Sequence, residues 1–584
     1  MKQKTNLSLI LILFFVLIFS ACGGGNTETV TQPLTITQNE TTSEESAPIA
    51  SQPDNNSSGN TSVVTETVVE EIEVAPAVEY EAVEEAPAEE VAAEEYDAAE
   101  DAASEPLPPA PMATAPASNN IATAPLATPM PTQAPLPRNT FFEDYGVNPY
   151  TLTTVDHLST FSLDVDTGSY SIARNYIMDG HRPPADAVRV EEFVNTFDQG
   201  YSIPPNTAFA VYADGAPSPF HNDGTHFIRI GVQGQEIPES VRPSAALTFV
   251  IDVSGSMNQE NRLGLVKRSL QLLVDQMRAD DSMSIVVYGS DARVVLPPTS
   301  GAYKDAIIST IYSLEPEGST NMEAGLLLGY EQANRAYIPN GINRVILASD
   351  GVANVGDTGP NSLAAKIRGY ADSGIQLTTV GFGMGNYNDV MMEQLADQGD
   401  GHYAYVDTLQ QAEDLFITNL MSTLQTIALD AKIQVDFDSN VVQQYRLIGY
   451  ENRAIADQDF RNDNIDAAEF GAGHTAAAIY AVQFVPGAQG RIATVNLRWQ
   501  DPQTRVVQEI SGTFTTNDLA RNFDDAPIRH QVSVVVSQFA ELLRNSYWTE
   551  NVSMNDLSIR ADRLAAQTGD PAIIELASLI SLSK

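Results

Sequence analysis

The chain has 584 residues, which is long enough for several domains. It carries 76 Asp and Glu against 31 Lys and Arg, a formal net charge of -45. This acidity argues against a nucleic-acid partner, because phosphate backbones are bound by clustered Lys and Arg. Cys22 is the single cysteine of the sequence, so an internal disulfide is excluded.

The first residues are typical of a targeting segment. Two lysines precede an apolar run, Leu9 to Phe19, and small residues follow in Ser20-Ala21-Cys22. This order indicates a secretory signal, and the run is shorter than the ~20 residues of a membrane span. Ser20-Ala21-Cys22 resembles the lipobox of bacterial lipoproteins. The resemblance implies a signal peptide at 1–21, lipidation of Cys22 and a cell-envelope location, on the outer membrane if the cell is Gram-negative, since Gly23 follows.

Residues 22–140 are predicted to be a disordered tether. From Asn26 to Pro137 the sequence has no Lys or Arg and is dominated by Glu, Ala, Pro, Ser, Thr and Asn. Such a segment has too little apolar surface to offset its chain entropy, and its like charges and prolines favour extended conformations. Much of the net negative charge lies here. A binding tail for a basic partner is the alternative.

Residues 141–244 are predicted to be a flanking domain. "AFAVYADG" and "THFIRIGVQGQEI" alternate like strands. Before them lies "FSLDVDTGSYS", Phe161 to Ser171, which leads into a helical pattern. We expect Asp164, Asp166 and Ser169 to cap this helix and fix a turn. A second metal site at these aspartates is the alternative.

Residues 245–426 alternate short apolar strands with helical patterns. Strands such as Leu247–Ile251 and Met283–Gly289 are apolar on both faces, and helical spacing follows, as in Leu263–Met277. This rhythm predicts an α/β fold, a doubly wound and mostly parallel sheet with helices on both sides. No repeat at a solenoid period is evident.

Residues 427–584 are predicted to be a β-rich domain with a helical end. Antiparallel strands are expected first, as in "AKIQVDF" and "HTAAAIYAVQFV". Helices are expected at Ile528–Leu543, Met554–Gln567 and Pro571–Leu582. We expect the two β-rich flanks to pack together, because the two ends of the central domain should lie near one another.

Three loops of the α/β part carry oxygen ligands. The candidate residues are Asp252, Ser254, Ser256, Thr320 and Asp350. All three loops can meet at one edge of a doubly wound sheet, where ligands bind at the carboxyl ends of the strands. Carboxylates and hydroxyls are hard ligands that suit Mg²⁺, with Mn²⁺ or Ca²⁺ as alternatives. One coordination position could stay open for a carboxylate from another molecule.

The motifs Asp-x-Ser-x-Ser, a later Thr and Ser-Asp-Gly, set among buried strands, resemble the von Willebrand factor type A domain. The resemblance implies a metal-ion-dependent adhesion site at these five residues and non-enzymatic, cation-dependent binding of a protein ligand. The sequences around Phe161 and Tyr450 resemble the N-terminal extension and the C-terminal domain of unknown function of a secreted bacterial subfamily. An envelope scaffold or stress-response component without a metal-bridged ligand is the alternative.

Two enzymatic interpretations fit the sequence poorly. Ser254 and Ser256 stand in Val-Ser-Gly-Ser-Met, whereas a hydrolase nucleophile needs Gly-x-Ser-x-Gly. An aspartic protease needs two carboxylates that share a proton. The further motifs beside Asp166-Thr167-Gly168, at Asp357 and Asp372, do not follow apolar strands. We therefore expect no catalytic residues.

Overall fold

The computed structural model describes residues 31–38 and 142–584, apart from 351–359, 384–388 and 419–423. The predicted signal peptide, Cys22 and most of the predicted tether lie outside these residues. No helix within the described ranges is long and apolar enough to cross a bilayer.

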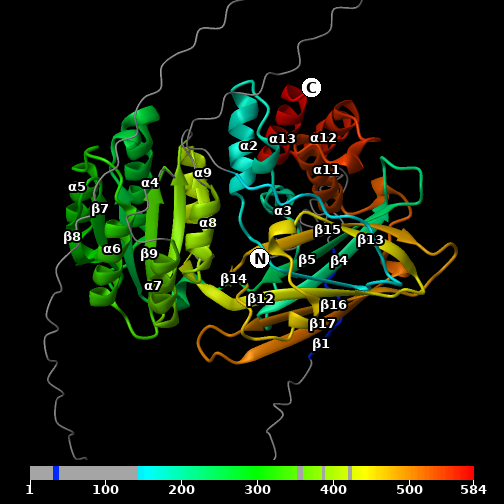
Figure 1. Ribbon diagram of the computed structural model, residues 1–584, viewed down its shortest axis with the longest axis horizontal. Coiled ribbons are helices and arrows are strands. Elements are labelled where there is room, and N and C mark those ends of the chain that lie inside the picture. Colours follow the sequence, from blue (N-terminus) through cyan, green and yellow to red (C-terminus); the bar gives the residue numbers. More distant parts are fainter. Residues whose placement is uncertain (1–30, 39–141, 351–359, 384–388, 419–423) are drawn as a thin grey trace, which may run out of the picture. The chain divides into compact units, whose positions relative to one another are not determined.

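A six-stranded sheet in the order β11-β10-β9-β6-β7-β8 forms the α/β part of the protein (Figure 1). Neighbouring strands are parallel, except that β7 and β8 are antiparallel. The strands are β6 (Ala245–Asp252), β7 (Ser282–Tyr288), β8 (Ala292–Ser300), β9 (Ile342–Ser349), β10 (Gln376–Phe382) and β11 (Tyr403–Val406). The predicted doubly wound, mostly parallel sheet is confirmed.

Helices cover both faces of this sheet because side chains along its strands alternate between two apolar clusters. In β6, Phe249 belongs to the cluster that contains residues of α4, α5 and α9, whereas Val250 belongs to the cluster that contains residues of α6, α7 and α8. The helices are α4 (Arg262–Gln276), α5 (Lys304–Tyr312), α6 (Met322–Ala336), α7 (Pro360–Asp372), α8 (Asp389–Asp397) and α9 (Leu409–Glu413). Ile172, from before the α/β part, joins the second cluster.

Two further sheets combine strands from before and after the α/β part. One has the order β2-β13-β15-β5-β4, and the other has the order β1-β17-β16-β12-β14 with β3 paired to β12. Their facing side chains share one apolar core. The strands are β1 (Ile36–Gln38), β2 (Thr151–Leu152), β3 (Leu158–Ser162), β4 (Phe209–Pro217), β5 (His226–Gly234), β12 (Thr426–Phe437), β13 (Val442–Ile448), β14 (Ala468–Gly471), β15 (Thr475–Phe484), β16 (Arg491–Gln500) and β17 (Val507–Thr515). The expected packing of the two flanks together is confirmed.

A group of helices packs on the five-stranded sheet and shares an apolar cluster with it. They are α2 (Gly168–Met178), α3 (Val190–Asn195), α11 (Ile528–Leu543), α12 (Met554–Thr568) and α13 (Pro571–Leu582). The C-terminal three match the helices that periodicity predicts. They also lie together in Figure 1, where the red end of the chain adjoins α2.

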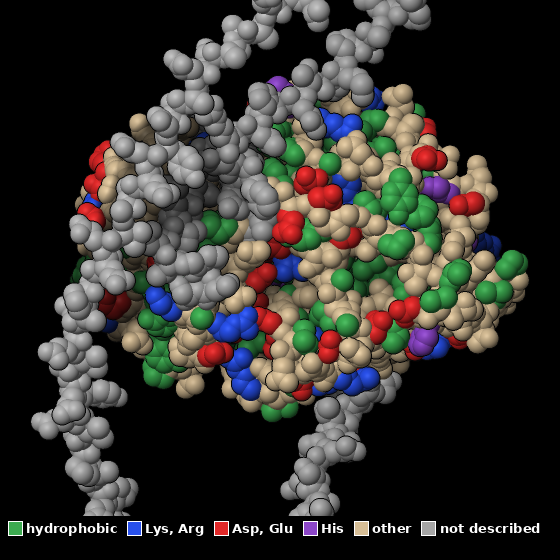
Figure 2. Space-filling model, in the orientation of Figure 1, with side chains coloured by type: hydrophobic (Ala, Val, Ile, Leu, Met, Phe, Trp, Pro, Cys, Tyr) green, Lys and Arg blue, Asp and Glu red, His purple; other side chains and the backbone are tan. Residues whose placement is uncertain are grey.

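One strand lies inside the segment that composition predicts to be a tether. Ile36–Gln38 form β1, which pairs antiparallel with β17. The prediction of a tether over residues 22–140 therefore needs a correction at 31–38, because this segment pairs with β17 and forms further hydrogen bonds to the folded part. Acidic and basic side chains are interspersed over the described surface seen in Figure 2, so this face carries no patch of one sign.

Candidate metal centre

The carboxyl ends of β6 and β9 carry residues that are predicted to bind a metal. β6 ends at Asp252, and the chain turns through Ser254 into a short 3-10 helix, η3 (Gly255–Asn261). The Val253 N–H holds this turn by donating to the Tyr288 carbonyl, at 2.9 Å, where β7 ends. β9 ends one residue before Asp350, and β6 and β9 are parallel neighbours, so both aspartates lie at one edge of the sheet.

Asp252 is a fully buried carboxylate that forms no ion pair with another described residue. Its Oδ1 accepts the Ser254 N–H at 2.8 Å, and its Oδ2 accepts the Ser349 hydroxyl at 3.0 Å. Burial is the main cause that raises the pKa of Asp252 to about 6, and the charge of Asp350 adds to it. Among the described residues no Lys, Arg or His forms an ion pair with Asp252. An uncompensated buried charge is costly, so this position favours a bound cation.

Ser254 and Ser256 place two hydroxyl oxygens beside this carboxylate. Their Oγ atoms are 3.0 Å apart, with Ser254 buried and Ser256 half-buried. Between them, the Gly255 N–H donates to the Gly318 carbonyl at 3.3 Å and joins the first loop to the second. The pair supplies neutral hard donors that add no further negative charge to the site.

Thr320 lies in the second loop, which backbone hydrogen bonds fix against the first. The Glu317 N–H donates to the Val253 carbonyl at 2.5 Å, and the Asn321 N–H donates to the Gly289 carbonyl at 2.9 Å. Gly318 between them has a φ of 73°, a conformation that favours glycine. The half-buried Thr320 side chain forms no hydrogen bond with another described residue. The structure therefore places the Thr320 loop beside the candidate metal centre, but no hydrogen bond within the described part of the chain orients the Thr320 hydroxyl.

Asp350 has a cationic neighbour that the motif analysis missed. Arg262, the first residue of α4, donates from Nη1 to Asp350 Oδ2 at 2.8 Å, and both side chains are buried. A signal for it exists in the sequence. Arg262 stands four residues before Val266 and eight before Leu270, both on the buried face of α4, so helical spacing turns it toward the core.

The donor set fits a hard divalent cation. Within the described ranges, no three or more His, Cys, Asp or Glu side chains are grouped as a metal site. Among the described residues the candidate centre has two carboxylates, Asp252 and Asp350, with serine hydroxyls beside Asp252. Mg²⁺ is commonly bound through one or two carboxylates and completes its shell with other oxygens and water. The buried, uncompensated Asp252 beside paired hydroxyls meets that requirement.

The second aspartate motif has a different role from the one predicted. Helix α2 follows Thr167, whose side chain does not cap it, and the Ser169 N–H in its first turn is bound at 2.7 Å by Glu192 of α3. Asp164 does fix a turn, because it accepts the Asp166 N–H at 2.8 Å. Asp166 itself accepts the N–H of Tyr403 in β11 at 3.3 Å. The prediction that Asp164, Asp166 and Ser169 cap the helix is therefore wrong.

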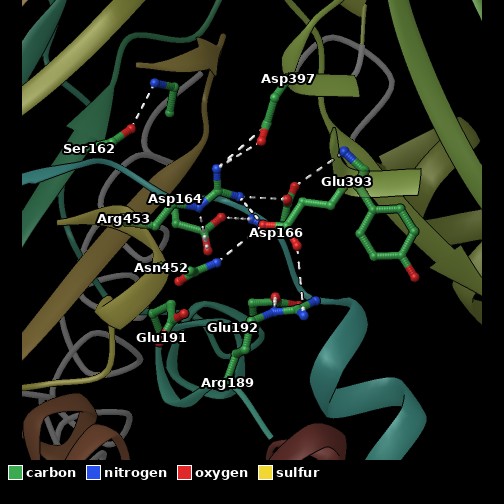
Figure 3. Close-up of polar contacts among 12 residues, drawn as sticks. Ser162, Asp164, Asp166, Arg189, Glu191, Glu192, Glu393, Asp397, Asn452 and Arg453 are labelled. Atoms are coloured by element: carbon green, nitrogen blue, oxygen red, sulfur yellow. Dashed lines mark hydrogen bonds and ion pairs between the residues drawn. The ribbon is translucent and has the colours of Figure 1, made fainter. Parts of the chain in front are cut away.

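These aspartates belong to a largely buried group of charges around Arg453, here called the Arg453 cluster (Asp164, Asp166, Glu393, the partly exposed Asp397, and Arg453; Figure 3). Arg453 contacts Glu393 at 2.6 Å, Asp397 at 3.3 Å, Asp166 at 3.4 Å and Asp164 at 3.8 Å. Glu393 and Asp397 lie on α8, so the cluster joins three parts of the chain. The alternative prediction is a second metal site at Asp164 and Asp166. In the structure the guanidinium of Arg453 supplies the positive charge that a metal ion would supply there.

The Arg453 cluster shifts the pKa values of its members in opposite directions. Burial raises the pKa of Asp166 well above its usual value, and the neighbouring charge of Asp164 adds to this. Burial acts in the same way on Glu393, but Arg189 and Arg453 together hold its pKa below the usual value. Glu393 therefore keeps its charge, and Asp166 takes up protons more readily.

Comparison with known families gives three matches along the chain. Residues 246–418 match the von Willebrand factor type A domain, residues 137–229 match a family described as von Willebrand factor, and residues 422–491 match the C-terminal part of the uncharacterized protein YfbK.

Among individual proteins, the uncharacterized protein YfbK of Escherichia coli (strain K12) is 35% identical over 469 residues, which cover 76% of this chain and 80% of YfbK. Human inter-alpha-trypsin inhibitor heavy chain H3 is 28% identical over 172 residues, 28% of this chain and 19% of that protein. The solved structure of a von Willebrand factor type A protein from Catenulispora acidiphila has a TM-score of 0.39 at 15% identity, over 63% of this chain and 89% of that chain.

Proposed function

Because the chain belongs to the family of Escherichia coli YfbK and contains a von Willebrand factor type A domain, we propose that it binds a protein ligand through a divalent cation. Asp252, Ser254, Ser256, Thr320 and Asp350 would hold the cation, with Mg²⁺ first and Mn²⁺ or Ca²⁺ as alternatives. The observation that carries this proposal is the buried Asp252 carboxylate, which has hydroxyl neighbours and no ion pair among the described residues.

Arg262 determines how the site balances charge. Its guanidinium already pairs with Asp350, so within the described part of the chain Asp252 is the carboxylate of this centre that has no ion pair. When bound, a divalent ion supplies a positive centre that attracts a carboxylate. One carboxylate compensates half of a dication's charge, so the filled site remains positive toward its surroundings. An acidic side chain of a protein ligand is the group that this charge selects, and no catalytic step is involved.

The role of Asp252 can be tested by metal titration of the chain without its lipid. We expect Mg²⁺ and Mn²⁺ to raise the melting temperature of the wild type, because an ion bound only to the folded state stabilises it by about 3 kcal/mol at a hundred times its Kd. Asp252→Ala should show no metal-dependent rise, and the exposed Asp291→Ala should behave like wild type. Equal metal responses of Asp252→Ala and wild type would contradict the proposed site.

Ligand binding needs a second measurement with the same proteins. Immobilised wild type in Mg²⁺ is expected to retain an envelope protein that EDTA releases and that Asp252→Ala does not retain. Stabilisation by metal without any EDTA-sensitive partner would favour the alternative, a scaffold that binds no metal-bridged ligand.

We also propose that the chain is a lipoprotein of the cell envelope, anchored through Cys22. The support is the sequence Ser20-Ala21-Cys22 behind a short apolar run. Cys22→Ser should move the protein from the membrane fraction to the soluble fraction, because the proposed lipidation needs the thiol of Cys22 and serine has none. Membrane retention of Cys22→Ser equal to that of wild type would contradict the anchor.

A further inference from the structure

Residues 31–38, called the strap, lie across the edges of both antiparallel sheets. β4 is an edge of the five-stranded sheet, and β17 would be an edge of the other sheet without β1. Pro33 forms a bridge with Tyr212 in β4, and the Leu34 N–H donates to the Val211 carbonyl at 2.8 Å. Ile36–Gln38 then pair with β17. The strap therefore satisfies backbone groups on two edges that would otherwise be open to other strands.

The start of the strap enters a buried polar network. Thr31 is 7% exposed, and its hydroxyl donates to Asp214 Oδ2 at 2.8 Å and accepts from Arg229 Nη2 at 3.3 Å. Asp214 also contacts His530 Nδ1 at 2.7 Å. Thr31 thus bonds directly to side chains of β4 and β5, and Asp214 connects it further to α11.

Strand β17 has a glycine, Gly512, where Leu34 of the strap approaches it. Gly512 lies in the interior of β17, where glycine weakens a strand unless another part of the molecule must come close. A Cβ at Gly512 would lie 2.8 Å from the Leu34 Cβ, so any larger residue would collide with the strap. Leu34 in turn packs against the apolar core between the sheets. The absence of a side chain at Gly512 is explained by the strap.

From these contacts we infer that the β4 and β17 edges form a strand-binding groove whose occupant is this chain's own N-terminal segment. Residues 39–141 then join two points that are both held on the same folded unit, Gln38 in β1 and the chain from Phe142 onward. The acidic segment therefore follows a first attachment of the chain to the folded unit, so it does not separate that unit from the N-terminus.

This connectivity limits how far the folded unit can lie from the membrane, a consequence that rests on the lipidation of Cys22 proposed above. Residues 23–30 are the only ones between Cys22 and the strap. At ~3.4 Å per residue they span about 30 Å when fully extended. The folded unit would then be held close to the membrane surface, whereas a spacer reaching to residue 140 would let it move several hundred ångström away.

A disulfide between the strap and β17 tests the groove without lipid and without metal. In a Cys22→Ser chain, which has no other thiol, Thr37→Cys and Ser511→Cys are cross-strand partners. We expect mild oxidation to join them within one chain. A glutamate-specific protease, which has many sites in the acidic segment, should then leave the N-terminal fragment attached to the folded part on a non-reducing gel and release it on a reducing gel.

Two controls make the result specific. Thr37→Cys with Val507→Cys is four residues out of register and should give less than about a tenth of the cross-linked product, because disulfides need Cα atoms within about 7 Å. Gly512→Val in the first pair should lower the yield roughly tenfold by colliding with Leu34. Equal yields for both pairs would overturn the inference. Dimers joined between chains as the main product at low concentration would overturn it too, by showing that the groove takes a strand from a second copy.

Because these proteins carry neither lipid nor metal, failure of the cross-link would leave the proposed metal site and anchor unaffected. Failure of those proposals would equally leave the strap in place.

Discussion

Arg453→Ala is expected to lower the free energy of unfolding by about 3–5 kcal/mol, the cost of removing one partner from a buried ion pair. The Arg453 side chain is 10% exposed and faces Asp164, Asp166, Glu393 and Asp397. Without Arg453, three buried carboxylates and the partly exposed Asp397 lose a shared positive charge, and repulsion among them adds to the desolvation cost of the buried ones. Urea denaturation followed by circular dichroism at pH 7.5 measures the difference.

A surface arginine provides the matched control for this substitution. Arg335 forms an i,i+4 pair with Glu331 on α6, and both side chains are more than half exposed. Exposed helical pairs contribute about 0.3–0.5 kcal/mol, so Arg335→Ala should change the unfolding free energy little. If Arg453→Ala and Arg335→Ala have effects of the same size, the Arg453 cluster does not stabilise the fold as its burial implies.

Glu191→Gln is expected to stabilise the protein at alkaline pH and to have no effect at low pH. Burial, followed by the charges of Glu451 and Asp164, raises the pKa of Glu191 to about 7 from 4.5. The folded state thus binds this proton more tightly than the unfolded state. Ionisation of Glu191 therefore lowers the free energy of unfolding progressively as pH rises from about 4.5, and the full loss is reached above about pH 7. At 1.4 kcal/mol per pKa unit, the gain at pH 8 is about 3 kcal/mol.

The substitution keeps the hydrogen bond that Glu191 accepts from the Tyr450 N–H at 2.9 Å, because an amide oxygen can accept it equally. Tyr450 has a positive φ of 63°, so this bond supports a strained backbone position. Melting temperatures of wild type and Glu191→Gln at pH 4.5, 6 and 8 should diverge with pH. Glu331→Gln, on the surface of α6, should show no such divergence. A constant difference between Glu191→Gln and wild type across the range would contradict the raised pKa.

The α/β fold is predictable because its signals are local. Leu247–Ile251 reads as a buried strand from apolar residues alone, and the structure extends it to Ala245–Asp252. The helix predicted at Ile528–Leu543 has the same bounds in the structure, since its 3.6-residue periodicity is strong. β1 was missed because three residues in a polar, acidic context carry no such pattern. Its partner, β17, lies almost at the other end of the chain.

The candidate site is predictable to the extent that its residues sit in local motifs. Asp252, Ser254 and Ser256 follow a strand directly, and Asp350 follows another, so topology alone brings them to one edge. Arg262 was missed because it is 88 positions from Asp350, and the pairing depends on how α4 packs. Asp164 and Asp166 were misassigned for the same reason. Their partner Arg453 comes 287 positions after Asp166 in the sequence, beyond the α/β part, so a local helix cap was the nearest interpretation.

The interleaved strands of the five-stranded sheet have a consequence for the order of folding. Ile230 in β5 pairs with Ala478 in β15, whereas every strand of the α/β sheet lies between Ala245 and Val406. Contacts between distant parts of a chain form slowly, and chains emerge from the ribosome from the N-terminus. The central sheet has all its strands while β5 still lacks its neighbour β15. The α/β part should therefore fold before the two flanking sheets are complete. The strands β1, β2 and β3, whose partners all come after the α/β part, should be among the last to be paired.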